Sequence, residues 1–259
     1  MTELATHPSL PLVHAINVVR RERHGSSSPV VVECDDGTWF TKLRGAAQGV
    51  PTLIAELIVA ELAEHLALPT PARSLVELPA NIPSADVNDE LRQLLDASVG
   101  TNVGFALLEN ARNLERQEAE RVPLEIAAAV LWLDMLVQNF DRTPANPNIM
   151  VRRGTYWLID HGATLPFQHD WSSVREESAQ RPYKIETHLF GFAAPVLSLA
   201  HDLLAPRITR DALNASVAIV PGEFLSVFGG DVARRRAMYS AYLWKRLQWM
   251  NKQLDAAAT

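Results

Sequence analysis

The pattern of apolar and polar positions predicts a strand-rich N-terminal part. Short apolar runs separated by turn residues are expected to be strands, at 16–20, 30–34, 39–43, 73–78 and 101–108. Asp36-Gly37 predicts a tight hairpin between the second and third runs. A helix is expected at 52–66, since Pro51 stands at its start and Pro69 follows its end, and a shorter one at 89–97.

The remainder of the chain has helical periodicity, interrupted by one hairpin. Helices are expected at 126–137, 195–204, 211–220 and 231–254. The hairpin is expected to join strands 148–152 and 155–159 through the turn Arg153-Gly154. The segment at 167–184 has little periodicity. The predicted fold class is therefore α+β.

Composition narrows the class of protein. A chain of 259 residues with 47% hydrophobic content and no low-complexity tract is long enough to bury a sizeable core. The net charge of −6 argues against direct nucleic-acid binding. The single Cys34 excludes an internal disulfide and a cysteine-based zinc site. Because neither a long apolar run nor a signal peptide is recognisable, we expect no membrane association and a cytoplasmic location.

The stretch 136–162 contains the residues that phosphoryl transfer needs. That reaction requires a carboxylate near the attacking hydroxyl and hard oxygen ligands for Mg²⁺. Asp141 follows an apolar helical run and precedes a proline-containing loop, in which Asn146 offers an amide oxygen. The predicted hairpin returns Asp160 to this loop, and Gly162 is expected to allow a sharp turn there. On its own, such a motif also occurs in ordinary surface turns.

Two upstream residues fit the same chemistry. Lys42, on the third predicted strand, would reach the phosphates of a nucleotide, although a lysine on a strand is also typical of a solvated edge. Glu56 lies within an apolar helix, where an acid is costly unless it is paired, and Lys42 would pair it. The alternative is that Glu56 faces solvent, as is expected of Glu61 and Glu64.

D-R-x-x-x-N at 141–146, followed by L-I-D-H-G at 158–162, resembles the catalytic loop and metal motif of the HipA-like kinases. The resemblance implies ATP and Mg²⁺ as cofactors, Asp141 as catalytic base, and Asn146 with Asp160 as metal ligands. It also implies a two-lobed, protein-kinase-like fold. Residues 1–109 would form a small β-rich N-lobe that binds nucleotide and contains one buried helix, and residues 110–259 a mainly helical C-lobe.

The resemblance extends to the nucleotide-binding elements. The L-P-T-P exit after the helix selects Glu56 over its neighbouring acids, and the segment at 101–108 resembles the last strand and hinge. Backbone groups from Leu107 to Glu109 would then bind adenine. In place of a glycine-rich loop stand Ser26, Ser27 and Ser28, which would hold the phosphates with Lys42; a plain hairpin tip is the alternative. In the family, a serine of this loop can be autophosphorylated, which switches the enzyme off.

Three functions remain open on the sequence. The first is an ATP-dependent Ser/Thr protein kinase of HipA type that phosphorylates an unidentified acceptor, with 167–184 as its activation or substrate segment. The second is a small-molecule or lipid kinase that uses the same catalytic residues. The third is a non-catalytic pseudokinase that binds nucleotide or a partner, against which the presence of all five catalytic residue types weighs. Some HipA-like kinases are toxins with a DNA-binding antitoxin. We expect the short chain to lack the extra N-terminal subdomain of larger members, which argues against that partner.

Overall fold

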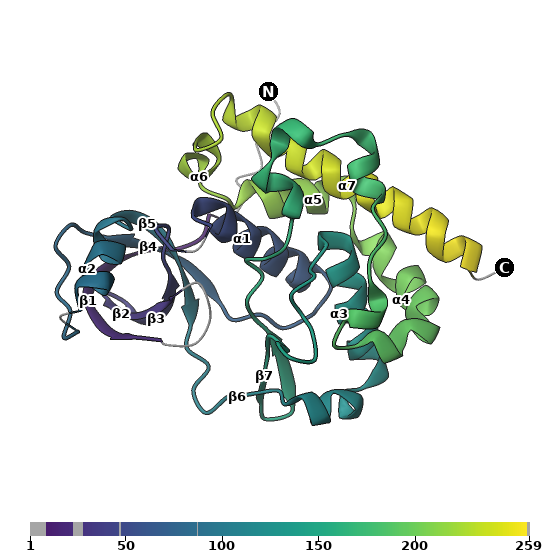
Figure 1. Cartoon of the computed structure of the whole chain (residues 1–259), viewed down its shortest axis with the longest axis horizontal. Coiled ribbons are helices and arrows are strands. Elements are labelled where there is room, and N and C mark those ends of the chain that lie inside the picture. Colours follow the sequence, from purple (N-terminus) through teal and green to yellow (C-terminus); the bar gives the residue numbers. More distant parts are fainter. Residues whose placement is uncertain (1–8, 23–27, 47, 87, 258–259) are drawn as a thin grey trace, which may run out of the picture.

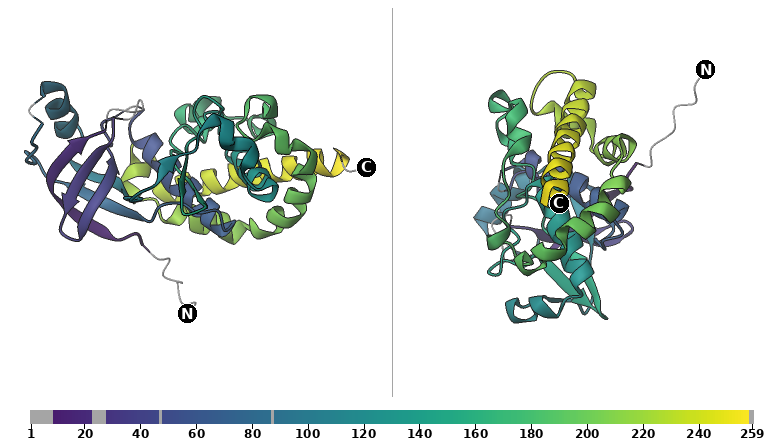
Figure 2. Two further views of the ribbon diagram at one scale, coloured as in Figure 1. Left: turned by 90° about the horizontal axis from the view of Figure 1, so that it is seen from below. Right: turned by 90° about the vertical axis from the view of Figure 1, so that its right-hand side faces the viewer.

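The computed structural model describes residues 9–22, 28–46, 48–86 and 88–257. A strand-rich N-terminal part lies beside a helical C-terminal part (Figures 1 and 2). The strands are β1 (Leu12–Arg21), β2 (Val30–Cys34), β3 (Gly37–Lys42), β4 (Arg73–Leu78), β5 (Gly100–Ala106), β6 (Arg112–Asn113), β7 (Ile149–Arg152) and β8 (Thr155–Leu158). The α-helices are α1 (Val50–His65), α2 (Asp89–Asp96), α3 (Leu124–Val137), α4 (Leu197–Leu204), α5 (Arg210–Ala218), α6 (Gly222–Ser226) and α7 (Val232–Ala257). The expected mixed α+β class is confirmed.

Strands β1 to β5 form a closed barrel in the order β1-β2-β3-β5-β4. A tight hairpin joins β2 to β3 as predicted, but its turn residues are Asp35 and Asp36, and Gly37, which pairs with Cys34, already belongs to β3. Lys42 at the end of β3 pairs with Val103 of β5. The barrel closes through a parallel pairing of β1 with β4, in register at Leu12 and Leu75. Its interior forms an apolar core of its own, to which α2 contributes Leu91 and Leu95. Closure leaves this small sheet without exposed edges.

Helix α1 is buried along most of its length and lies between the barrel and the C-terminal helices (Figure 1). Its apolar residues belong to the larger core, which it shares with α3, α5 and α7. The acids on this helix have different environments. The side chain of Glu56 is completely buried, whereas Glu61 and Glu64 bind the guanidinium of Arg73 at 2.8 and 2.9 Å. The solvent-facing alternative for Glu56 is therefore wrong.

The hairpin β7–β8 brings the chain back to the loop that follows α3. Arg153 and Gly154 both have positive φ values, 49° and 80°, as the predicted two-residue turn requires. The N–H of Ile159 donates to the carbonyl oxygen of Asn148 at 3.1 Å, which prolongs the pairing by one step. The short strand β6, which the sequence did not predict, adds a third strand to this sheet.

The C-terminal half consists of helices joined by turns of 3₁₀ helix. These turns are Arg116–Arg121, Pro166–His169, Trp171–Ser173, Glu176–Gln180, Ile185–Thr187, Gly191–Val196 and Ala205–Arg207. The helix expected at 195–204 begins only at Leu197, because Pro195 belongs to the preceding 3₁₀ turn. Helix α6 was not predicted. No helix in the described ranges is both long and apolar enough to cross a membrane.

The long helix α7 runs across the C-terminal part (Figure 1). Its start was predicted correctly, since the carboxylate of Asp231 accepts a hydrogen bond from the N–H of Arg234 at 2.9 Å. The three arginines that begin it do not share one solvated face. Arg234 is exposed, Arg235 lies over the ring of Trp171, and Arg236 donates to the last carbonyl groups of α5. Only the first of the three is therefore a solvated surface arginine.

Candidate active site

The ammonium group of Lys42 lies between two carboxylates. It forms an ion pair with Glu56 of α1 and a second with Asp160, at 2.6 Å from Oδ1, and only 5% of Lys42 is exposed. The predicted pairing of Lys42 with Glu56 is confirmed, and the solvated-edge alternative for the lysine is wrong. Since Lys42 and Asp160 are 118 residues apart, only the fold brings them together.

The protonation of this cluster follows from burial and charge. Burial by itself would lower the pKa of Lys42, but the carboxylates of Glu56 and Asp160 raise that pKa above its usual value. Burial would likewise raise the pKa of Asp160, but the facing ammonium group holds it below the usual value. For Glu56 the burial effect prevails and its pKa is raised, although Lys42 opposes this. Lys42 is therefore charged at neutral pH.

The second oxygen of Glu56 fixes the backbone beyond Asp160. Oε2 accepts a hydrogen bond from the N–H of His161 at 3.0 Å. The left-handed residue at this turn is Asp160, with φ of 57°, and Gly162 has no positive φ. The expectation that Gly162 supplies the sharp turn is thus wrong. A Cβ at Gly162 would lie 2.4 Å from Cγ2 of Thr52, so this position requires glycine because it packs against α1.

Asp141 lies in the loop after α3, half-buried. Its Oδ2 accepts hydrogen bonds from the side-chain amides of Asn146 and Asn148, at 2.8 and 2.9 Å. The N–H of Asp141 donates to Oδ1 of Asn139 at 3.0 Å. The structure thus brings Asp141 and Asn146 into contact, and adds two asparagines that the sequence analysis did not single out.

A buried acid at the end of α3 holds this loop in place through hydrogen bonds. Asp134, in the last turn of α3, accepts hydrogen bonds from Nε of Arg142 at 2.6 Å and from the amide of Asn139 at 2.9 Å. Nε2 of His188 lies 2.9 Å from the same carboxylate. Burial would raise the pKa of Asp134, but Arg142 and His188 lower it to about 2. The sequence did carry a signal for Asp134, because an acid within an apolar helix needs a partner; no such signal marks His188.

The two halves of the site are joined through the backbone. The bond between Ile159 and Asn148 places Asp160 next to the loop that contains Asp141. A model of the HipA-like kinases matches residues 15–205, from the first barrel strand to the end of α4. The chain belongs to the HipA-like kinase family. The matched range contains every described residue of the site.

The fold agrees with this family. The structure of a proinflammatory kinase from Helicobacter pylori, CtkA, is similar to this HipA-like kinase with a TM-score of 0.56. The alignment covers 96% of this chain and 99% of that one, at 10% sequence identity. At such identity the similarity is one of fold alone. The search of curated proteins found no match.

The residues of this HipA-like kinase that were predicted to bind adenine and the phosphates make few contacts with the rest of the site. Leu107 is half-buried and Glu109 exposed, directly after β5. Ser26 and Ser27 lie outside the described residues. Ser28 has a positive φ of 41°, and its hydroxyl accepts a hydrogen bond from Arg21 at 3.2 Å.

The segment 167–184, expected to act in activation or substrate binding, is folded onto the C-terminal helices. Phe167 is buried and stacks on Tyr242 of α7, with ring centroids 3.7 Å apart. The hydroxyl of Tyr183 donates to the carbonyl oxygen of Asn139. Beyond the end of the segment, the N–H of Leu189 donates to the carbonyl oxygen of Arg142 at 3.0 Å. This part of the chain therefore contacts the loop that contains Asp141.

Two donors in this HipA-like kinase suit a magnesium ion. The carboxylate of Asp160 is 41% exposed, and Asn146, whose amide nitrogen is bound to Asp141, keeps its amide oxygen for a ligand. Mg²⁺ is usually bound by one or two protein oxygens together with the phosphates of a substrate. Across the described ranges, no group of three or more His, Cys, Asp or Glu residues could hold a metal by itself. The residues present thus fit a metal that arrives with a nucleotide.

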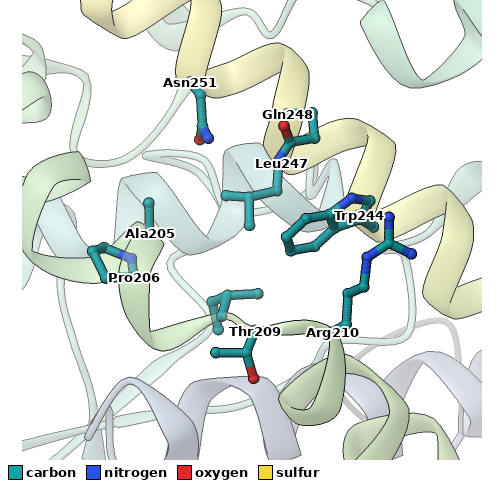
Figure 3. Close-up of a pocket in the computed structure, with 9 residues that line it drawn as sticks. Ala205, Pro206, Thr209, Arg210, Trp244, Leu247, Gln248 and Asn251 are labelled. Carbon is teal, nitrogen blue, oxygen red and sulfur yellow. The ribbon is translucent and has the colours of Figure 1, made fainter.

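A separate cavity of about 320 Å³ lies between α7 and the segment that joins α4 to α5 (Figure 3). Its lining is mainly apolar, and the guanidinium of Arg210 covers the ring of Trp244 at 4.6 Å. None of the site residues above lines it.

Proposed function

We propose that this chain is an ATP- and Mg²⁺-dependent kinase that transfers the γ-phosphate of ATP to a hydroxyl group of a serine or threonine in a protein. The observation that supports this best is the pairing of Lys42 with both Glu56 and Asp160. In protein kinases the phosphate-binding lysine forms an ion pair with a helix glutamate, and a separate aspartate binds Mg²⁺.

In this proposal Asp141 accepts or orients the proton of the acceptor hydroxyl. Two amides are bound to its Oδ2, whereas among the described residues its Oδ1 has no hydrogen-bond partner. The carboxylate is half-buried, so its position is fixed while one oxygen remains for the hydroxyl. Asp134, Asn139 and Arg142 act indirectly by holding the loop.

Lys42 binds the α- and β-phosphates, and Glu56 orients it. Ser26, Ser27 and Ser28 complete the phosphate site, and the backbone from Leu107 to Glu109 binds adenine. Residues 1–109 and 110–259 are then the two lobes of the kinase. The pairing of β5 with β3 supports this, because the segment after β5 continues from the strand next to the one that carries Lys42.

Asn146 and Asp160 would hold the magnesium ion. A magnesium ion held there with ATP would supply positive charge to neutralise the phosphates. Asp160 is paired with Lys42 in the structure, so one acid adjoins both the phosphate-binding cation and the proposed metal position. Asp160 also has a positive φ of 57°, a strained backbone conformation of the kind that is common at functional sites.

The direct test is transfer of labelled γ-phosphate from ATP and Mg²⁺, read as both self-labelling and ATP consumption. We expect activity in the wild type and a loss of at least about 100-fold in Asp141→Asn and in Asp160→Asn. Asp202→Asn removes the same charge from an exposed position on α4 and serves as the matched control. Undiminished transfer in Asp141→Asn would contradict the assigned base.

The same assay separates the proposal from a non-catalytic protein. Binding of MgATP, measured as a rise in the unfolding temperature, without any ATP consumption would indicate a nucleotide-binding pseudokinase. Consumption of ATP that is stimulated by a small hydroxyl compound, and not by proteins, would indicate a small-molecule kinase. Neither outcome is favoured by a contact in the structure.

A further inference from the structure

An aromatic ring is exposed directly beside the proposed catalytic base. Phe140 immediately precedes Asp141 and is 42% exposed. Its ring stacks on that of Tyr183, with centroids 5.2 Å apart and planes at 22°. Single exposed apolar side chains are common in proteins and need no explanation. Phe140 differs from these because it directly precedes Asp141 and stacks on Tyr183 of the segment 167–184, which was expected to act in activation or substrate binding.

The aromatic pair is anchored to the catalytic loop itself. The hydroxyl of Tyr183 donates to the carbonyl oxygen of Asn139, and the side chain of Asn139 binds both the N–H of Asp141 and the carboxylate of Asp134. Because its hydroxyl is already engaged, Tyr183 presents its ring rather than a hydrogen-bonding group. The pair is thus an apolar surface whose position is fixed relative to Asp141.

We propose that Phe140 and Tyr183 form one wall of the acceptor site and select a peptide in which the phosphorylated serine or threonine has an aromatic or large apolar neighbour. This inference rests on the proposed kinase function. Consecutive residues of an extended chain are about 3.3–3.6 Å apart, so a peptide that brings its hydroxyl to Asp141 brings the adjoining residue to within reach of Phe140. An apolar neighbour there removes the exposed part of the ring from water.

The expected size of the selectivity follows from aromatic contacts. Such contacts in proteins correspond to about 2- to 13-fold in a binding or rate ratio beyond the burial of area. The wild type is therefore expected to phosphorylate a serine flanked by Phe at least about 2-fold more efficiently, in kcat/KM, than the same serine flanked by Ala. Leu is expected to lie between the two, and Glu below Ala.

The experiment uses the full chain, MgATP and a set of alanine-based peptides that have one serine and differ only in its neighbour, Phe, Leu, Ala or Glu. Phe140→Ala should bring the ratio between the Phe and Ala peptides close to one. A purely structural role would lower the rates for both peptides equally and leave the ratio unchanged. Phe140→Leu keeps most of the apolar volume and serves as a second variant in case Phe140→Ala does not fold. It should retain part of the preference for the Phe peptide over the Ala peptide.

Two matched variants sharpen the test. Phe192→Ala removes a ring of similar exposure, 40%, outside the catalytic loop and should leave the ratio unchanged. Tyr183→Phe keeps the ring and loses only the hydrogen bond to Asn139, so it should lower kcat while the ratio between peptides persists.

The outcomes are distinguishable. A wild-type preference for Phe that disappears in Phe140→Ala supports the inference. Equal rates for all four peptides, or a preference that survives Phe140→Ala, overturns it. ATP consumption without phosphorylation of any peptide also overturns it, while phosphoryl transfer as such still stands. Absence of ATP consumption in the wild type refutes the proposed function and, with it, this inference.

Discussion

The contact between Gly162 and α1 yields the sharpest prediction about the architecture of the site. A Cβ at this position would lie 2.4 Å from Cγ2 of Thr52 and 3.1 Å from Oε1 of Glu56. The first distance is far below van der Waals contact, and Thr52 is buried on a helix that is itself buried. Gly162 has no positive φ, so Gly162→Ala introduces a steric conflict without backbone strain.

Overpacking of this kind costs about 1–3 kcal/mol. For a chain of this length we expect the unfolding temperature to fall by about 2–10 °C. Because Glu56 lies in the path of the new methyl group, the ion pair with Lys42 should be displaced as well. We therefore expect a loss of phosphoryl transfer in Gly162→Ala that is larger than the loss of stability alone produces.

Thr52→Ser removes the conflicting methyl group and keeps the hydroxyl. Alone, this substitution should lower the free energy of unfolding by about 1 kcal/mol, because one buried methyl group is lost. Combined with Gly162→Ala, it should relieve the steric conflict. The free energy of unfolding of the double variant should then be about 1–2 kcal/mol higher than the sum of the two single effects predicts. Urea unfolding of all four proteins measures this difference.

Gly222→Ala is the matched control, because that glycine also lacks a positive φ and its Cβ would meet only an ordinary contact, at 3.7 Å from Val232. It should leave stability within about 0.5 kcal/mol. If Gly162→Ala were as stable as Gly222→Ala, or if the two substitutions at Gly162 and Thr52 were additive, the close approach of this turn to α1 would be refuted.

Three further predictions concern the buried charges and the helix start. Lys42→Met should lower the free energy of unfolding by about 3 kcal/mol, because it leaves Glu56 buried without its partner. Adding Glu56→Gln should restore part of that free energy, measured by urea unfolding. If the losses of the two substitutions were additive, the pairing of Lys42 with Glu56 would be contradicted. Because the pKa of Asp134 is lowered to about 2, its carboxylate contributes about 2 kcal/mol to the free energy of unfolding, complete above about pH 4 and lost as the pH falls towards 2. The difference in unfolding free energy between wild type and Asp134→Asn should therefore shrink by about 2 kcal/mol over this pH range. A difference that does not depend on pH would contradict the lowered pKa of Asp134. Asp231→Ala should cost about 1 kcal/mol through the lost cap of α7, and an unchanged unfolding temperature would show that the cap contributes nothing.

Much of the local structure followed from the sequence. The strands β2 and β4 were predicted to the residue, and the turn at Arg153-Gly154 has the positive φ values that its residue types favour. The start of α7 after Asp231 was likewise predicted. These features depend on a few neighbouring residues, through alternation of apolar positions, turn chemistry and capping, so a linear pattern contains the information.

The candidate site was predictable only in part. Asp141, Asn146 and Asp160 were recognisable because their motif is compact, and the need of Glu56 for a partner followed from the apolar character of its helix. Asp134 could have been found by the same argument.

Tertiary structure alone decided the rest. Closure of the barrel by β1 and β4, the packing of α1 into the larger core, and the meeting of Lys42 with Asp160 all join segments that are distant along the chain. The role of Gly162 was misjudged for the same reason, since its constraint comes from Thr52 on another element. The sequence by itself determined which groups the site contains and which short elements form. The packing of the elements decides which of those groups are in contact. Burial and ion pairing depend on residues that are distant along the chain, so the local sequence does not specify them.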